Sequence, residues 1–132
     1  MTAESYKTLL QGIVDSHVPE EALVFEVEGE RMVNSLFSEQ WEEDNTQGHA
    51  DRYGFADLTT VKPVLDIVVI ALTTFKVITE LRLLKKKGAN LDLSKVQQHW
   101  EQRLRQDGVK SGKAKVISTE FTQDVMALAD RE

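Results

Sequence analysis

The chain has 132 residues, a formal net charge of −6 at pH 7 and no cysteine. This length suits one domain with its own core, and an apolar fraction of 41% argues against a wholly disordered chain. The lack of cysteine excludes disulfides, thiolate catalysis and zinc sites with cysteine ligands. The first residues show no basic segment followed by an apolar one, so we expect a cytoplasmic protein.

The charge is unevenly distributed along the chain. Residues 1–60 hold thirteen acidic and three basic side chains, whereas residues 61–132 hold nine acidic and thirteen basic ones. Most of the basic side chains lie between Lys76 and Lys115. Two interpretations follow from this asymmetry: the acidic half packs against the basic half within one fold, or the basic face binds an anionic partner.

Two helices are expected in the first 40 residues. Thr2 is a suitable cap, and the apolar residues that follow recur at helical spacing, which predicts a helix over residues 2–16. A proline followed by two glutamates is typical of a helix start and predicts helical structure over residues 19–40, with a break near Gly29. Residues 22–28 also alternate between apolar and polar positions, so both helix and strand stay open for them.

Residues 38–57 are polar, acidic and rich in turn-forming residues, which predicts a loop. A loop of this length is uncommon in a small domain unless it has a function. It carries the aromatic residues Trp41, Tyr53 and Phe55 among its acidic ones. In a recognition segment the rings would supply affinity and the acids would steer the partner. The alternative, which the usual burial of aromatic rings favours, is that they pin the loop to the core.

The segment from about residue 60 to residue 87 is the longest apolar-rich stretch, and it contains no glycine. It predicts one long helix that is apolar around most of its circumference, as in helices covered by neighbours on several sides. A membrane span is the rival interpretation. Asp66 and Lys76 interrupt the apolar run, however, and each would be costly at the centre of a bilayer. We therefore expect the centre of a soluble helical bundle.

Two further helices are expected after this segment. The lysines and the glycine at residues 85–88 are typical of a helix end. An aspartate then caps a predicted helix over residues 92–106, and Trp100 is expected to clamp that helix against the long one. Residues 107–115 are interpreted as a basic, glycine-containing loop, and apolar spacing predicts a last helix over residues 117–129.

Motifs that carry chemistry are missing. Only three residues separate Gly108 from Gly112, whereas a phosphate-binding P-loop has four between its first glycine and Gly-Lys. The three histidines lie in separate elements, without the spacing of a metal site. No signature of a serine nucleophile occurs. We therefore expect no enzyme activity, no cofactor and no metal site.

Together these observations predict one all-α domain over residues 1–132, a compact bundle around the helix at about 60–87. The function we expect is a non-enzymatic protein–protein interaction or adaptor/regulatory module, acting through charge-complementary assembly with a protein partner or with itself as an oligomer. The candidate partner-binding residues are basic or aromatic: Lys85, Lys86, Lys87, Lys95, Arg103, Arg105, Trp41, Tyr53 and Phe55.

Peripheral binding to an anionic membrane surface is the alternative, because Lys85–Lys87 beside an apolar helix resemble a polybasic membrane-binding segment. The same lysines are explained without any partner as cations that complement a helix dipole. Nucleic acid is not expected as a partner, because the chain is acidic overall and has no motif for reading bases.

Overall fold

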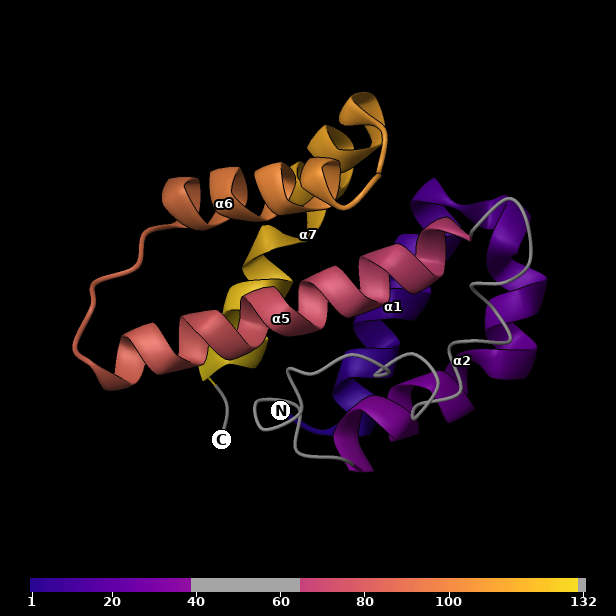
Figure 1. Ribbon diagram of the computed structural model, residues 1–132, viewed down its shortest axis with the longest axis horizontal. Helices are drawn as coiled ribbons and strands as arrows, with labels where there is room; N and C mark the ends of the chain where they lie inside the picture. The colour runs from indigo at the N-terminus through magenta and orange to yellow at the C-terminus, as the bar shows by residue number, and fades with distance from the viewer. Residues whose placement is uncertain (39–64, 131–132) are drawn as a thin grey trace. The chain divides into compact units, whose positions relative to one another are not determined.

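The fold is all-α, as predicted (Figure 1). The structure, a computed structural model, describes residues 1–38 and 65–130. Within these ranges it contains five α-helices, one short 3-10 helix and no strand. In chain order the elements are α1 (Ala3–His17), the 3-10 helix (Pro19–Glu21), α2 (Ala22–Ser38), α5 (Asp66–Lys86), α6 (Leu93–Gln106) and α7 (Ser111–Asp130).

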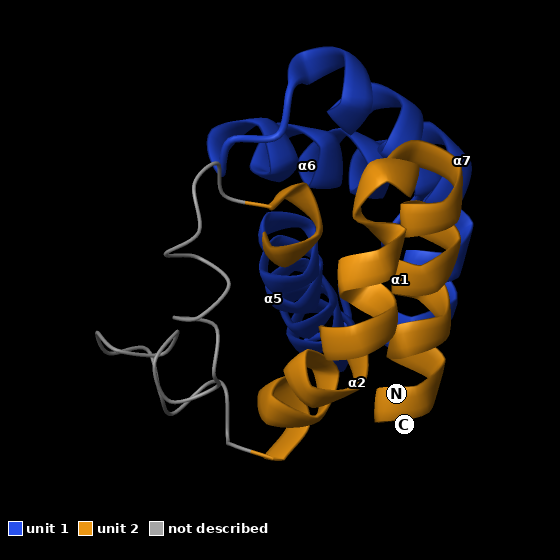
Figure 2. Cartoon of the chain, turned by 90° about the vertical axis from the view of Figure 1, so that its right-hand side faces the viewer, with its two compact units in different colours: residues 1, 69–132 blue, residues 2–68 orange. Residues whose placement is uncertain are grey.

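The chain divides into two compact units (Figure 2). One unit comprises residues 2–68, and the other comprises residues 69–132 with Met1. Helix packs on helix in both: α1 lies against α2 in the first, and α6 lies against α7 in the second. The boundary between the units falls within α5. The placement of all helices in a single domain around the long helix stays a prediction.

Helix α1 begins with a capping box. The Thr2 hydroxyl accepts the N–H of Ser5 at 3.0 Å, and the Ser5 hydroxyl accepts the N–H of Thr2 at 3.0 Å. These two bonds satisfy donors that have no partner inside the helix. The predicted helix over residues 2–16 is thus confirmed to within one residue at each end. Its apolar stripe is buried: Tyr6, Leu9, Leu10, Ile13 and Val14.

Helix α2 runs without interruption through Gly29, so the predicted break there is wrong. A Cβ atom at Gly29 would lie 2.9 Å from Cε1 of Phe25, one turn earlier. The glycine therefore makes room for a buried phenyl ring. The strand alternative for residues 22–28 is also wrong, because the whole stretch is helical. Phe25 points to the core, whereas Leu23 and Val27 stay exposed.

The start of α5 is set by Glu21, a residue 45 positions earlier in the chain. The Glu21 carboxylate accepts the backbone N–H groups of Asp66 at 2.9 Å and of Ile67 at 2.7 Å. A carboxylate at the positive end of the helix dipole is favourable, and it satisfies N–H groups that lack a helical partner. Leu65 is not helical, so the predicted start near residue 60 is wrong. Residues 60–64 lie outside the described residues.

Helix α5 ends as predicted. Gly88 has a φ of 85°, a left-handed conformation that glycine adopts without a steric penalty. The N–H groups of Gly88 and Ala89 each donate at 3.0 Å, to the carbonyls of Lys85 and Leu84. This pair of bonds is a Schellman motif, which satisfies the last carbonyls of the helix.

Helix α6 begins and ends on local signals, whereas α7 begins earlier than predicted. The Asp92 carboxylate caps α6 by accepting the Lys95 N–H at 2.8 Å, as expected. Gly108, with a φ of 112°, follows its end. The predicted loop over residues 107–115 is wrong from Ser111 onward, because α7 starts there. Gly112 lies in the first turn of α7, with nothing within 4 Å of the position that a Cβ atom would take.

Trp100 lies against the long helix, as predicted. Its side chain is fully buried, and its indole N–H donates to the Thr74 hydroxyl at 3.0 Å. Helix α7 buries a stripe of small and apolar side chains: Ala114, Ile117, Ser118, Thr122, Val125, Leu128 and Ala129. None of the helices in the described ranges is long and apolar enough to cross a membrane.

Candidate interaction surfaces

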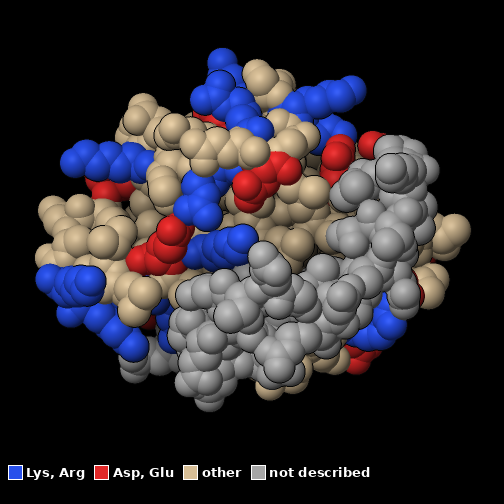
Figure 3. Space-filling view, in the orientation of Figure 1, with Lys and Arg blue, Asp and Glu red and all other residues tan. Residues whose placement is uncertain are grey.

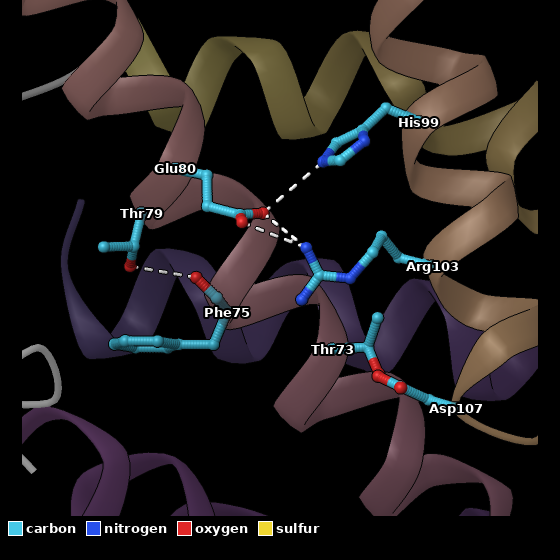
Figure 4. Close-up of polar contacts among 7 residues, drawn as sticks. All are labelled: Thr73, Phe75, Thr79, Glu80, His99, Arg103 and Asp107. Carbon is cyan, nitrogen blue, oxygen red and sulfur yellow. Dashed lines mark hydrogen bonds and ion pairs between the residues drawn. The ribbon is translucent and has the colours of Figure 1, made fainter. Parts of the chain in front are cut away.

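A polar cluster joins α5 to α6 (Figure 4). Arg103 Nη1 on α6 lies 2.8 Å from Oε1 and 3.0 Å from Oε2 of Glu80 on α5. His99 Nε2, one turn before Arg103, lies 3.4 Å from the same Oε1. The Arg103 side chain is 24% exposed, compared with 45% for Glu80. One carboxylate thus holds two side chains of the facing helix.

A second bond between the same helices lies near this cluster. The buried Thr73 hydroxyl donates to Oδ2 of Asp107 at 2.5 Å. Asp107 is the C-cap residue of α6, so this bond fixes the end of α6 against α5. In Figure 4 these side chains extend toward one another across the gap between the two ribbons. The arrangement explains how the helices stay in register.

The cluster has the residue types of an acid–base pair but not the geometry. A histidine beside a carboxylate can act as a general base when the carboxylate orients it. Here Arg103 engages both oxygens of Glu80, and the His99 contact is the longest of the three. No group of three or more metal-ligating side chains occurs in the part of the chain that the structure describes. We therefore interpret the cluster as an interhelical ion pair.

Half of the predicted partner-binding cations are ion-paired within the chain. These pairs are Lys85 with Asp130, Lys95 with Asp92 and Arg103 with Glu80. Such surface pairs contribute little to stability, but they leave less of the positive charge of these side chains for a partner. Lys86, Lys87 and Arg105 are exposed, and no residue in the described ranges forms an ion pair with them. The aromatic candidates Trp41, Tyr53 and Phe55 lie outside the described residues.

The C-terminal turn of α5 combines apolar and basic side chains. Leu83 is 51% exposed and Leu84 is 43% exposed, and Lys86 and Lys87 follow them on the next turn. We call these four residues the basic end of α5. Figure 3 shows Lys and Arg side chains around this end of the helix and over α6. The sequence did not single out the two leucines, because apolar residues in a long apolar helix are expected in the core.

The outer side of α2 combines apolar and acidic side chains. Leu23 and Val27 are each 72% exposed and lie four residues apart, on one face of the helix. Glu26 and Glu30 are exposed three residues after each of them. We call these four residues the acidic face of α2. Sequence reasoning missed it, because the alternation of residues 22–28 left the direction of each side chain open.

A shallow groove between α1 and α2 offers no enclosed site. It is lined by Ala3, Glu4, Lys7, Glu30, Val33 and Asn34. The Lys7 ammonium and the Glu30 carboxylate face each other in it at 4.0 Å. Ligand sites are usually enclosed and largely apolar, whereas this groove is open and three of its six lining residues are charged.

Comparison with known proteins gives no relative. No protein-family model, no curated protein and no solved structure matches the chain.

Proposed function

We propose that the chain is a non-enzymatic protein–protein interaction module that acts through charge-complementary assembly. The observation that carries the proposal is the opposite charge of its two units. Residues 2–38 and 65–68 hold eight acidic and two basic side chains, whereas residues 69–130 hold seven acidic and eleven basic ones. Complementary fields accelerate encounter and select matched partners.

Exposed apolar side chains support the same proposal. Charge gives orientation and speed, but affinity at an interface comes mostly from buried apolar and aromatic anchors. The basic end of α5 offers both, since Leu83 and Leu84 are half-exposed beside Lys86 and Lys87. We therefore narrow the predicted cationic site to the side chains that make no described ion pair: Lys86, Lys87 and Arg105.

Two measurements test the proposal together. The first is the molar mass of the chain by light scattering at about 0.1 M and about 1 M salt, between which the Debye length falls from about 10 Å to about 3 Å. The second is capture of proteins from an extract of the native cells at the same two salt concentrations. We expect at least one salt-sensitive complex, and we expect K86E/K87E to weaken it.

The matched control is K110E/K115E, which makes the same change of charge on exposed lysines around the start of α7. It should leave the complex intact. If neither self-association nor capture of another protein depends on salt, or if K86E/K87E and the control weaken the complex equally, the proposal is wrong.

An anionic membrane surface is the second candidate. The adjacency of Leu83 and Leu84 to Lys86 and Lys87 favours it, because membrane-binding helices combine apolar and basic side chains. Most apolar side chains earlier in α5 are buried, including Ile70, Ile78 and Leu81, so only the last turn is available to lipid. Cosedimentation with vesicles that contain an anionic lipid, but not with neutral vesicles, would favour this candidate.

A further inference from the structure

We infer that the acidic face of α2 in one copy of the chain docks on the basic end of α5 in a second copy. The inference rests on the proposed function and names the partner as the chain itself.

The acidic face of α2 has the properties of a contact surface. The apolar side chains on the inner side of α2 are almost completely buried, with Phe25 1% and Met32 3% exposed. Leu23 and Val27 on the outer side are 72% exposed. Glu26 has no ion-pair partner among the described residues, and Glu30 is only loosely paired with Lys7 at 4.0 Å. Two apolar side chains thus lie beside two carboxylates, and Arg31, which follows on the same face, is paired with Glu28 at 3.0 Å.

The basic end of α5 is the matching surface. Leu83 and Leu84 are the exposed apolar pair, and Lys86 and Lys87 supply positive charge on the following turn. The neighbouring Lys85 is paired with Asp130, so the two outer lysines carry the available charge. Each surface therefore consists of two exposed apolar side chains and two like charges, spread over about two helical turns on α2 and about one on α5, and the signs are opposite.

Charge complementarity favours a second copy of the chain as the partner. Docking removes four apolar side chains from water and brings two carboxylates near two ammonium groups, whereas pairing like with like would place equal charges together. Two copies can make this contact reciprocally, which gives a closed dimer, or head to tail, which gives rings or open chains. The surfaces are smaller than a standard interface, so we expect a dissociation constant of about 1 μM or weaker.

Sedimentation velocity of the full chain over about 5 to 500 μM at about 0.1 M salt tests the inference. The wild type should gain mass with concentration. E26K/E30K and K86E/K87E should each lose at least about tenfold in self-association. An equimolar mixture of these two variants should associate again, because the first retains a native basic end and the second retains a native acidic face.

Two controls accompany the experiment. K110E/K115E should associate like the wild type, because its lysines lie outside both surfaces. Circular dichroism should show unchanged helix content in every variant. L23S/V27S, which removes the apolar pair but keeps the acidic charges, provides a second variant if charge reversal disturbs folding, and it should also weaken association at least about tenfold.

Several outcomes would overturn the inference. A wild type that stays monomeric at every concentration contradicts it, while salt-sensitive capture of another protein would leave the proposed function standing. Self-association that survives in all three surface variants assigns the contact elsewhere. If the variants fail to associate and their mixture also fails, the acidic face of α2 does not dock on the basic end of α5. The absence of both salt-sensitive self-association and salt-sensitive capture would also end the proposed function.

Discussion

The indole N–H of Trp100 donates to the hydroxyl of Thr74 at 3.0 Å, and both side chains are fully buried. The two residues lie on different helices, Trp100 on α6 and Thr74 on α5. A buried indole N–H needs an acceptor, because an unsatisfied donor in the core carries the full cost of its lost hydration. Thr74 therefore sets where α6 lies along α5.

Replacing Thr74 by valine keeps the shape of the side chain and removes the acceptor. We expect T74V to lower the free energy of unfolding by about 1–3 kcal/mol, because the Trp100 N–H stays buried without a partner. Urea denaturation followed by circular dichroism at 222 nm measures this change. The matched control is T119V, which removes exposed hydrogen bonds of a threonine on α7 and should cost less than about 0.5 kcal/mol.

Gly29 should resist substitution although it lies inside a helix. Alanine in place of a mid-helix glycine ordinarily stabilises by about 0.5–1 kcal/mol. At Gly29 the new Cβ would lie 2.9 Å from the Phe25 ring, and overpacking a core costs about 1–3 kcal/mol. We therefore expect G29A to destabilise by about 1 kcal/mol, as measured by thermal or urea unfolding.

Two comparisons make this expectation specific. G112A in α7 should be neutral or stabilising by up to about 0.5 kcal/mol, because nothing lies within 4 Å of its new Cβ. A smaller side chain at position 25 should remove the steric conflict, so G29A should be less destabilising, or even stabilising, in an F25L background. A penalty of equal size with phenylalanine or leucine at position 25 would show that the ring is not its cause.

Glu21 should govern the first turn of α5. We expect E21A to cost about 1–2 kcal/mol, in the range of a lost helix cap, and E21Q to cost less because one acceptor oxygen remains. Amide hydrogen exchange by NMR gives a direct readout. The N–H groups of Asp66 and Ile67, which Glu21 now accepts, should exchange faster in E21A. E26A, at an exposed glutamate of α2, should leave both rates unchanged.

Arg103 should act mainly within the chain. We expect R103Q to lower the free energy of unfolding by about 0.5–1 kcal/mol, because it breaks a partly exposed interhelical pair with Glu80. Salt should reduce the difference between this variant and the wild type. Self-association should be almost unchanged, in contrast to K86E/K87E. A large loss of association without a loss of stability would return Arg103 to the partner-binding surface.

The sequence by itself determined the elements whose signals are local. The Thr2 cap and the apolar spacing after it placed α1, Asp92 placed the start of α6, and Gly88 placed the end of α5. Each of these signals acts within about one helical turn, through a side chain that satisfies a nearby N–H or through a glycine with positive φ. The all-α class followed from the same periodicity.

Only the tertiary structure decided what depends on distant residues. The start of α5 requires Glu21, 45 residues away from Asp66, and the continuity of α2 through Gly29 requires the direction of the Phe25 ring. For the same reason, the sequence alone does not tell which candidate cations are ion-paired within the chain and which are left exposed. Arg103 and Lys86 look alike in the sequence, but only Arg103 faces a carboxylate, because packing of α6 on α5 brings Glu80 within 2.8 Å. The sequence gives the number and sign of the charged side chains. The tertiary structure decides which of them form ion pairs within the chain and which stay available to a partner.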